Sequence, residues 1–148
     1  MQTKIGFIVV CASVLLASAA GSAAHCLRYL PSKVSVTGTV FERTDWGPPN
    51  YREDPAHDRP EPHDYIRLDT PLCVFGVPGD APDDITEKNV SIMELAWDSE
   101  EWPIPNVVGR HVLLTGGLFH AISGHHHTRV LLMVSRVRAV TVTEGKAK

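Results

Sequence analysis

Alternation of apolar and polar residues predicts that this chain is built from β-strands. The clearest segment is 34–40, where valines alternate with serine, threonine and glycine, as in a strand with one face on a core. Further strands are predicted at 65–75, where Pro71 makes the strand irregular or an edge strand, and at 111–120 and 128–140. Residues 89–97 place Met93, Leu95 and Trp97 on one face of a strand, although so short a run also fits a helix.

Between these segments the apolar periodicity stops. Residues 43–64 hold five prolines among mixed charges, which predicts a long surface loop. Loops of that length in compact domains are usually functional or disordered. A second loop is predicted at 76–88 and a short one at 121–127, and residues 99–108 fit a helical turn.

One internal similarity bears on the fold. Residues 34–41 and 112–119 carry Val, Thr, Gly and Phe at the same four positions. A glycine inside a strand is favoured where the strand bends sharply or another backbone comes close. Glycines within the first and fourth of five strands predict an all-β fold, a small five-stranded OB-like Greek-key barrel in which these two strands are neighbours. An open β-sandwich is the alternative.

The beginning of the chain predicts export. Lys4 precedes an apolar run at 5–16 and small residues at 17–24, the layout of a cleavable signal peptide cut near Ala24 or Ala20. The apolar run is shorter than the roughly 20 residues of a membrane-spanning helix, so no membrane span is expected. We therefore expect a signal peptide at 1–24, the barrel at 25–142, a flexible tail at 143–148 and a periplasmic or secreted location.

The expected export also predicts how the cysteines pair. Removal of the signal peptide discards Cys11 and leaves Cys26 and Cys73, which predicts one disulfide in an oxidising compartment, with two buried thiols as the alternative. The formal net charge of −3 argues against general nucleic-acid binding, which relies on clustered Lys and Arg.

The chain resembles a family of small exported bacterial proteins classed only as a domain of unknown function. The resemblance covers nearly the whole mature chain, and its most specific parts are Gly-Pro-Pro-Asn-Tyr at 47–51 and Gly-His-His-His-Thr at 124–128. It implies the disulfide and an exported domain, and it carries no activity.

The two unusual loops supply the candidate binding residues. In an OB barrel the first loop and the last hairpin loop flank the face that binds extended ligands. Flat rings can stack a sugar, a peptide or a base. We therefore predict a ligand site formed by Trp46, Asn50, Tyr51 and His126, although Trp46 and Tyr51 could instead cap their own barrel.

The histidines also suggest a metal site. In an extended segment His125 and His127 would point to one side, and imidazole is a common ligand for Zn and Cu. The predicted metal set is His120, His125 and His127, joined by His57, His63 or a carboxylate of the first loop. The alternative is a polar loop whose histidines bond to backbone carbonyls.

These observations favour a binding module that recognises an unidentified ligand or envelope protein through residues 43–64 and 121–127. A periplasmic metal-binding protein is the second hypothesis, with Zn or Cu as the only cofactors considered, and a structural envelope module is the third. An enzyme is not favoured, because no Gly-x-Ser-x-Gly motif is present and the cysteines are expected to be paired. A histidine with Asp69 or Asp45 as a general base is the weakest hypothesis.

Overall fold

The computed structural model describes residues 26–97 and 106–140, which form six strands and no helix. The strands are β1 (Leu27–Arg28), β2 (Lys33–Trp46), β3 (Pro60–Phe75), β4 (Glu87–Trp97), β5 (His111–His120) and β6 (Val130–Ala139). Within these ranges no helix exists that could cross a membrane. The predicted signal peptide, most of the predicted helical turn and the predicted tail lie outside the described residues.

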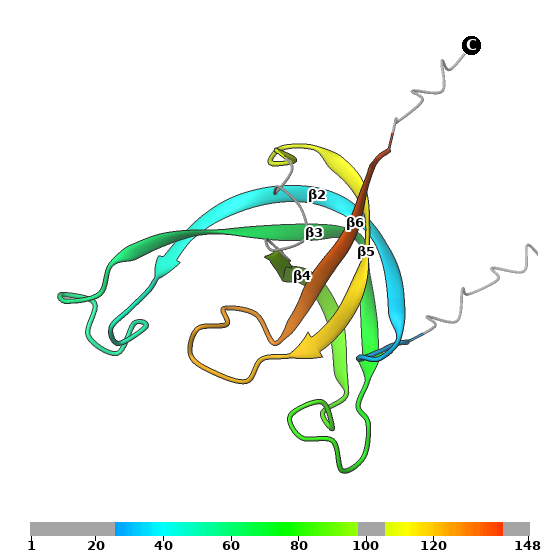
Figure 1. Ribbon diagram of the computed structural model, residues 1–148, viewed down its shortest axis with the longest axis horizontal. Coiled ribbons are helices and arrows are strands. Elements are labelled where there is room, and N and C mark those ends of the chain that lie inside the picture. Colours follow the sequence, from blue (N-terminus) through cyan, green and yellow to red (C-terminus); the bar gives the residue numbers. More distant parts are fainter. Residues whose placement is uncertain (1–25, 98–105, 141–148) are drawn as a thin grey trace, which may run out of the picture.

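Strands β2 to β6 close into a barrel (Figure 1). The sheet order is β1-β3-β2-β5-β6-β4, and the pairing of β3 with β4 closes it. Strands β4 and β6 are parallel, while the other pairs within the barrel are antiparallel. This is the predicted five-stranded OB-like Greek-key barrel, with the short strand β1 added in parallel to β3. The sandwich alternative is excluded, because the sheet closes on itself.

The barrel interior is filled by alternate residues of the strands. Val36, Val40, Met93, Leu114 and Leu132 are all buried in one hydrophobic cluster. Met93 and Leu95 point into this core as predicted, so the segment that also fitted a helix is a strand. The strand prediction at 65–75 is confirmed too, and the register of β3 against β4 shifts between Arg67 and Leu72, around Pro71.

The two similar segments, 34–41 and 112–119, lie side by side in β2 and β5. Their pairing is reciprocal, with Gly38 opposite Val112 and Val34 opposite Gly116. A methyl group on Gly38 would overlap the carbonyl oxygen of Arg67, and one on Gly116 would overlap that of Met133. Both glycines therefore allow the close backbone approach that the sequence predicted.

The predicted first loop, 43–64, is wrong in its limits. Strands β2 and β3 run on together beyond the other strands, pairing from Arg43 with His63 to Trp46 with Pro60 (Figure 1). The loop is only 47–59. The nitrogen and oxygen of Arg59 bond to Pro48 and Gly47, so the next residue, Pro60, directs its nitrogen away from β2. Prolines on such an unpaired edge cost no ladder hydrogen bond, which is why the proline-rich sequence still forms strands.

The predicted last loop, 121–127, is two residues longer in the structure. Strand β6 begins at Val130 instead of Thr128, so the loop is 121–129. The hydroxyl of Thr128 donates to the carbonyl of Val130 and accepts from the backbone nitrogen of Glu94, contacts that fix this residue outside the β6 ladder.

A disulfide joins Cys26 to Cys73 and so ties the start of the described chain to β3. The sequence prediction of this bridge is confirmed.

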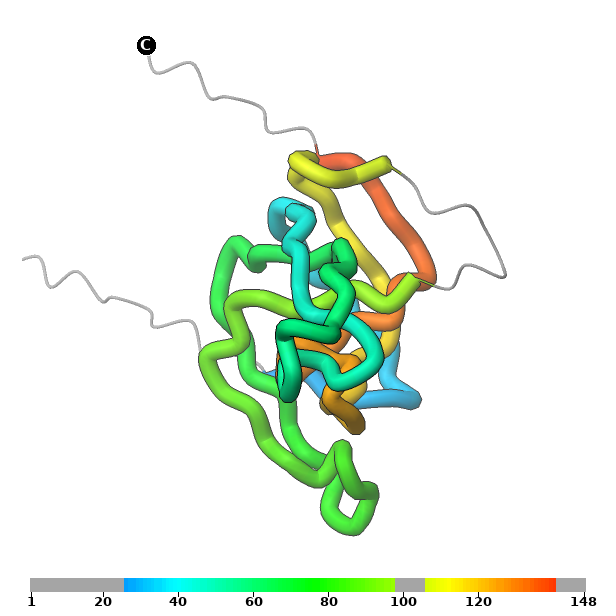
Figure 2. The backbone as a smooth tube through the Cα atoms, turned by 90° about the vertical axis from the view of Figure 1, so that its left-hand side faces the viewer, coloured from blue at the N-terminus to red at the C-terminus, as the bar shows by residue number. Residues whose placement is uncertain are grey.

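Loops 47–59 and 121–129 lie on one side of the molecule, on the left in Figure 1 and toward the viewer in Figure 2.

Candidate functional site

Loop 47–59 is held in shape by one buried carboxylate. Asp58 is 7% exposed and accepts hydrogen bonds from the backbone nitrogens of Asn50 and Arg52, each at 2.7 Å. The backbone φ angles of Tyr51 and Arg52 are 51° and 87°. Residues other than glycine adopt this left-handed conformation at a cost in free energy. The carboxylate of Asp58 compensates for this cost. Asn50, predicted as a ligand contact, contributes its backbone to this arrangement and does not line the groove described below.

The two loops contact each other through stacked rings. The ring of Tyr51 lies parallel to that of His125, with centroids 3.8 Å apart and an angle of 17° between the planes. The contact joins the Gly-Pro-Pro-Asn-Tyr segment to the Gly-His-His-His-Thr segment. The sequence alone placed these segments in two loops, and the structure brings them together.

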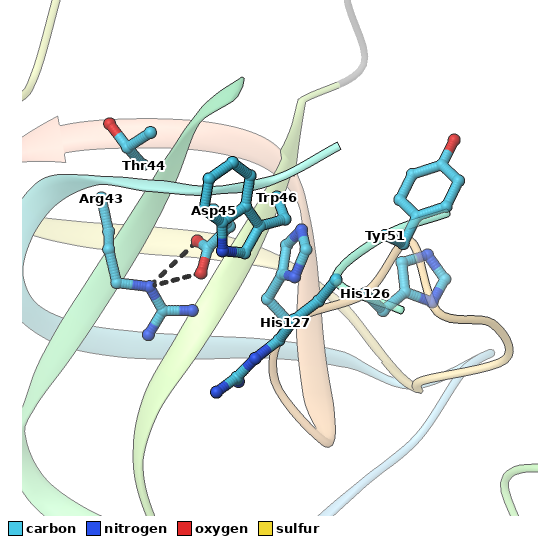
Figure 3. Close-up of a pocket in the computed structure, with 8 residues that line it drawn as sticks. Arg43, Thr44, Asp45, Trp46, Tyr51, His126 and His127 are labelled. Carbon is cyan, nitrogen blue, oxygen red and sulfur yellow. Dashed lines mark hydrogen bonds and ion pairs between the residues drawn. The ribbon is translucent and has the colours of Figure 1, made fainter. Parts of the chain in front are cut away.

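A groove of about 600 Å³ lies between the loops and the end of β2 (Figure 3). Trp46, Tyr51 and His126, three of the four predicted ligand residues, line it together. Trp46 is 38% exposed, so part of its ring is free for contact. The full lining consists of Arg43, Thr44, Asp45, Trp46, Tyr51, Arg52, His126 and His127.

Fixed charges form one wall of this groove. The guanidinium of Arg43 donates to Asp45 at 2.9 Å, lies over the ring of Tyr65 and donates to its hydroxyl, which in turn donates to Asp45 at 2.5 Å. Burial by itself raises the pKa of Asp45, but the bonds from Arg43 and Tyr65 and the charges of Arg43 and His127 outweigh it. The net pKa of Asp45 therefore lies below its usual value, and the carboxylate stays ionised.

His126 stabilises its own loop. Its Nδ1 accepts a hydrogen bond from the backbone nitrogen of Ile122 at 3.1 Å, and its ring meets the edge of Phe119. Burial lowers the pKa of His126, and nearby His125 and His127 lower it further against the opposing charge of Glu94. A neutral ring can accept the bond from Ile122, whereas a protonated one cannot.

His127 faces a different set of neighbours. One ring nitrogen of His127, one of His63 and a carboxylate oxygen of Glu94 lie within 4.8 Å of one another. The two imidazole rings meet edge to face with centroids 4.7 Å apart. Among the described residues this is the only group of three or more His, Cys, Asp or Glu side chains with such spacing. Two imidazoles and a carboxylate match the donors that a zinc-type ion takes in proteins.

The structure does not assemble the predicted metal set of His120, His125 and His127. His120 places Nε2 3.1 Å from Glu87 and Nδ1 3.1 Å from the carbonyl of Ala121, so both of its ring nitrogens are engaged. His125 stacks on Tyr51. The predicted extended segment fails because a turn closes the loop, with the nitrogen of His126 bonded to the carbonyl of Ser123. Only His127 of the predicted set belongs to the cluster.

Sequence reasoning allowed His63 as a partner but missed Glu94. Glu94 lies between Met93 and Leu95, both in the core, so strand alternation places it on the outer face of β4. There the loop 121–129 covers it, leaving the residue 5% exposed. The signal that was present is that Glu94 is the single carboxylate in the predicted strand 89–97. A His–Asp pair also forms, between His111 and Asp69 at 2.9 Å, and neither residue lines the groove.

Comparison with known proteins finds one family model that matches part of the chain. Residues 93–138 match the family model of DUF4431, a domain of unknown function. The match is consistent with the resemblance to an uncharacterised family. The DUF4431 segment contains Glu94, His126 and His127, whereas Trp46, Tyr51 and His63 lie outside it. No curated protein and no solved structure matches the chain.

Proposed function

We propose that this protein is an exported binding module that takes a small ligand in the groove between loops 47–59 and 121–129. The observation that carries the proposal is that Trp46 at the end of β2, Tyr51 of the first loop, and His126 and His127 of the last loop line one groove. Its volume of about 600 Å³ is in the range of small-molecule sites. The β2–β3 extension and the loop contacts hold this groove in place without a ligand, which lowers the entropic cost of binding.

The lining favours a polar ligand with one flat face, such as a sugar, a short peptide or a base. The exposed ring of Trp46 can stack on a flat face. Arg52 is exposed at the groove, and within the described ranges it forms no ion pair like that of Arg43 with Asp45, so it can pair with an anionic group. A neighbouring envelope protein could present such an anionic group to the groove.

Two features support export. The first 24 residues have the composition of a signal peptide. The bridge between Cys26 and Cys73 suits an oxidising compartment such as the periplasm or the exterior.

The test is a ligand screen that monitors individual residues by NMR. Disaccharides of the cell wall, short peptides and nucleosides are added separately to isotope-labelled protein. We expect one of these panels to shift the indole signal of Trp46 and the amide signals of His126 and His127. Trp46→Ala should abolish that binding, because it removes the stacking surface.

Ile85→Ala is the matched control, because Ile85 is an exposed apolar residue, 47% accessible, that does not line the groove. Unchanged affinity of Trp46→Ala for the ligand found, or shifts confined to residues away from both loops, would refute the proposed groove.

A further inference from the structure

We propose that His63, Glu94 and His127 bind a divalent transition-metal ion of the zinc class. This inference goes beyond the proposed function, because the metal would bind whether or not an organic ligand occupies the groove. It also replaces the metal set expected from sequence with a different one, in which only His127 is retained.

The three side chains come from three elements that the barrel brings together. His63 lies on the part of β3 that extends beyond the barrel, Glu94 on β4 and His127 in loop 121–129. Residue 65 of β3 pairs with Glu94, so His63, two residues earlier, lies on the same outer face as the carboxylate. The loop then places His127 over that face, with its backbone nitrogen donating to Glu94 at 2.6 Å.

The strongest observation is that each of the two imidazole rings has a buried nitrogen without a hydrogen-bond partner among the described residues. Among the described residues, four buried side-chain polar atoms lack a hydrogen-bond partner, and two of these are the Nε2 atoms of His63 and His127. A buried polar atom without a partner is unfavourable, and native structures contain few of them. The ring of His63 meets Glu94 through Nδ1, at 3.4 Å, which leaves Nε2 able to donate an electron pair to an ion, and the Nε2 of His127 is likewise unpaired among the described residues.

The charge of Glu94 points the same way. Its side chain is 7% exposed, and within the described part of the chain the only ion-pair partner is His63, at 3.4 Å. A buried carboxylate needs a compensating charge. A divalent cation would supply it, and the bond from the nitrogen of His127 already orients one carboxylate oxygen.

The ligand types select the class of metal. Imidazole nitrogen suits zinc, copper, nickel and iron, whereas magnesium and calcium prefer oxygen ligands. Three protein ligands leave one position of a tetrahedral zinc open. His127 also lines the groove (Figure 3), so the proposed metal site and the proposed ligand site share this residue.

The other histidines of the loop are already occupied. His126 accepts the bond from Ile122, and His125 stacks on Tyr51. The three consecutive histidines therefore have three tasks: contact between the loops, closure of their own loop and, by this proposal, metal binding.

The test is calorimetric titration of the disulfide-bonded protein with Zn²⁺, with Mg²⁺ as the comparison ion. We expect Zn²⁺ to bind one site and Mg²⁺ not to bind it. His63→Gln and His127→Gln should each weaken Zn²⁺ binding by roughly 100-fold, since loss of even an outer-shell partner costs 10–100-fold. His57→Gln in loop 47–59 and His125→Gln in loop 121–129 are the control variants and should retain the affinity.

A second measurement needs no variant, in case the substitutions disturb folding. Zn²⁺ should shift the imidazole NMR signals of His63 and His127 in the unmodified protein. Shifts at His120 and His125 instead, or equal affinity of the wild type and the His63→Gln/His127→Gln variant, would overturn the proposal. Trp46→Ala should leave Zn²⁺ binding intact, so failure of the ligand proposal and failure of the metal proposal can be told apart.

Discussion

Tyr29 shows the cost of burying a single polar atom in this small barrel. Its side chain packs in the core cluster and the residue is 1% exposed. No side chain or backbone group of residues 26–97 and 106–140 forms a hydrogen bond with its hydroxyl. Burial, together with the negative charges of Glu87 and Asp83, raises the pKa of Tyr29 to about 12. The neutral hydroxyl is therefore retained in the folded state at pH values where it would ionise in the unfolded chain.

This situation predicts the effect of Tyr29→Phe. At pH 7 the change removes an unpaired hydroxyl and should raise the free energy of unfolding by about 1 kcal/mol. Because the folded pKa exceeds the ordinary value of about 10, the wild type should lose stability as the pH rises from about 10 to 12, and the variant should lose less. Urea denaturation at pH 7 and pH 11 measures both effects. A less stable variant at pH 7 would mean that the hydroxyl has a partner.

Individual residues differ in how far the sequence could predict their roles. For Trp46, Tyr51 and His126 the sequence predicted only that they lie together, which the groove confirms, and their role in binding stays a prediction. Glu94 could not, since its burial depends on which loop folds over the outer face of β4. Asn50 was misjudged because its backbone, and not its side chain, meets the carboxylate of Asp58.

At the scale of elements, the two mid-strand glycines control how sharply β2 and β5 coil. Each lies so close to a carbonyl oxygen of a neighbouring strand that a side chain would overlap it. Regular strands could not approach so closely with a Cβ atom at these positions. The barrel therefore depends on glycine at both places.

Gly38→Ala and Gly116→Ala should each lower the free energy of unfolding by about 2 kcal/mol, because the extra methyl group forces backbone shifts. Gly124→Ala is the matched control: a methyl group there would meet Tyr51 at an ordinary 3.8 Å, and its effect should stay within about 0.5 kcal/mol. Thermal and chemical denaturation of the three variants compares them. Equal stability of all three would contradict the role assigned to the close approaches.

Strands were predictable at this scale wherever apolar and polar residues alternate, and β5 was predicted with its correct limits. The extension of β2 and β3 was not, because residues 43–46 and 60–63 pair with each other and none of them is buried. The five prolines of residues 43–64 indicated a loop instead. The pairing survives because the strand edge next to Pro60 is unpaired, a fact that local sequence does not reveal.

For the whole molecule, the bridge between Cys26 and Cys73 joins positions 47 residues apart. Beside it, β1 pairs with β3 through Leu27 and Val74. In the chain-entropy model, closing a loop of this length stabilises the folded state by about 4 kcal/mol. A domain of this size has a limited core, so the bridge is a large share of its net stability.

The Cys26→Ser/Cys73→Ser variant should therefore unfold with a free energy about 4 kcal/mol smaller than that of the oxidised wild type. Guanidinium denaturation of both proteins measures the difference, and the reduced wild type is the control for the serine substitutions themselves. A difference below about 1 kcal/mol would contradict the entropic contribution assigned to the bridge.

Closure of the barrel has a consequence for the segment that the family model recognises. Residues 93–138 contain the last five residues of β4, all of β5 and all but the last residue of β6. Their neighbours in the barrel, β2 beside β5 and β3 beside β4, come from earlier in the chain. Cutting the chain at 93 would remove both neighbours and leave two rows of backbone donors and acceptors open to pairing with other molecules. The segment that is recognisable by sequence is thus smaller than the segment that completes its own hydrogen bonding.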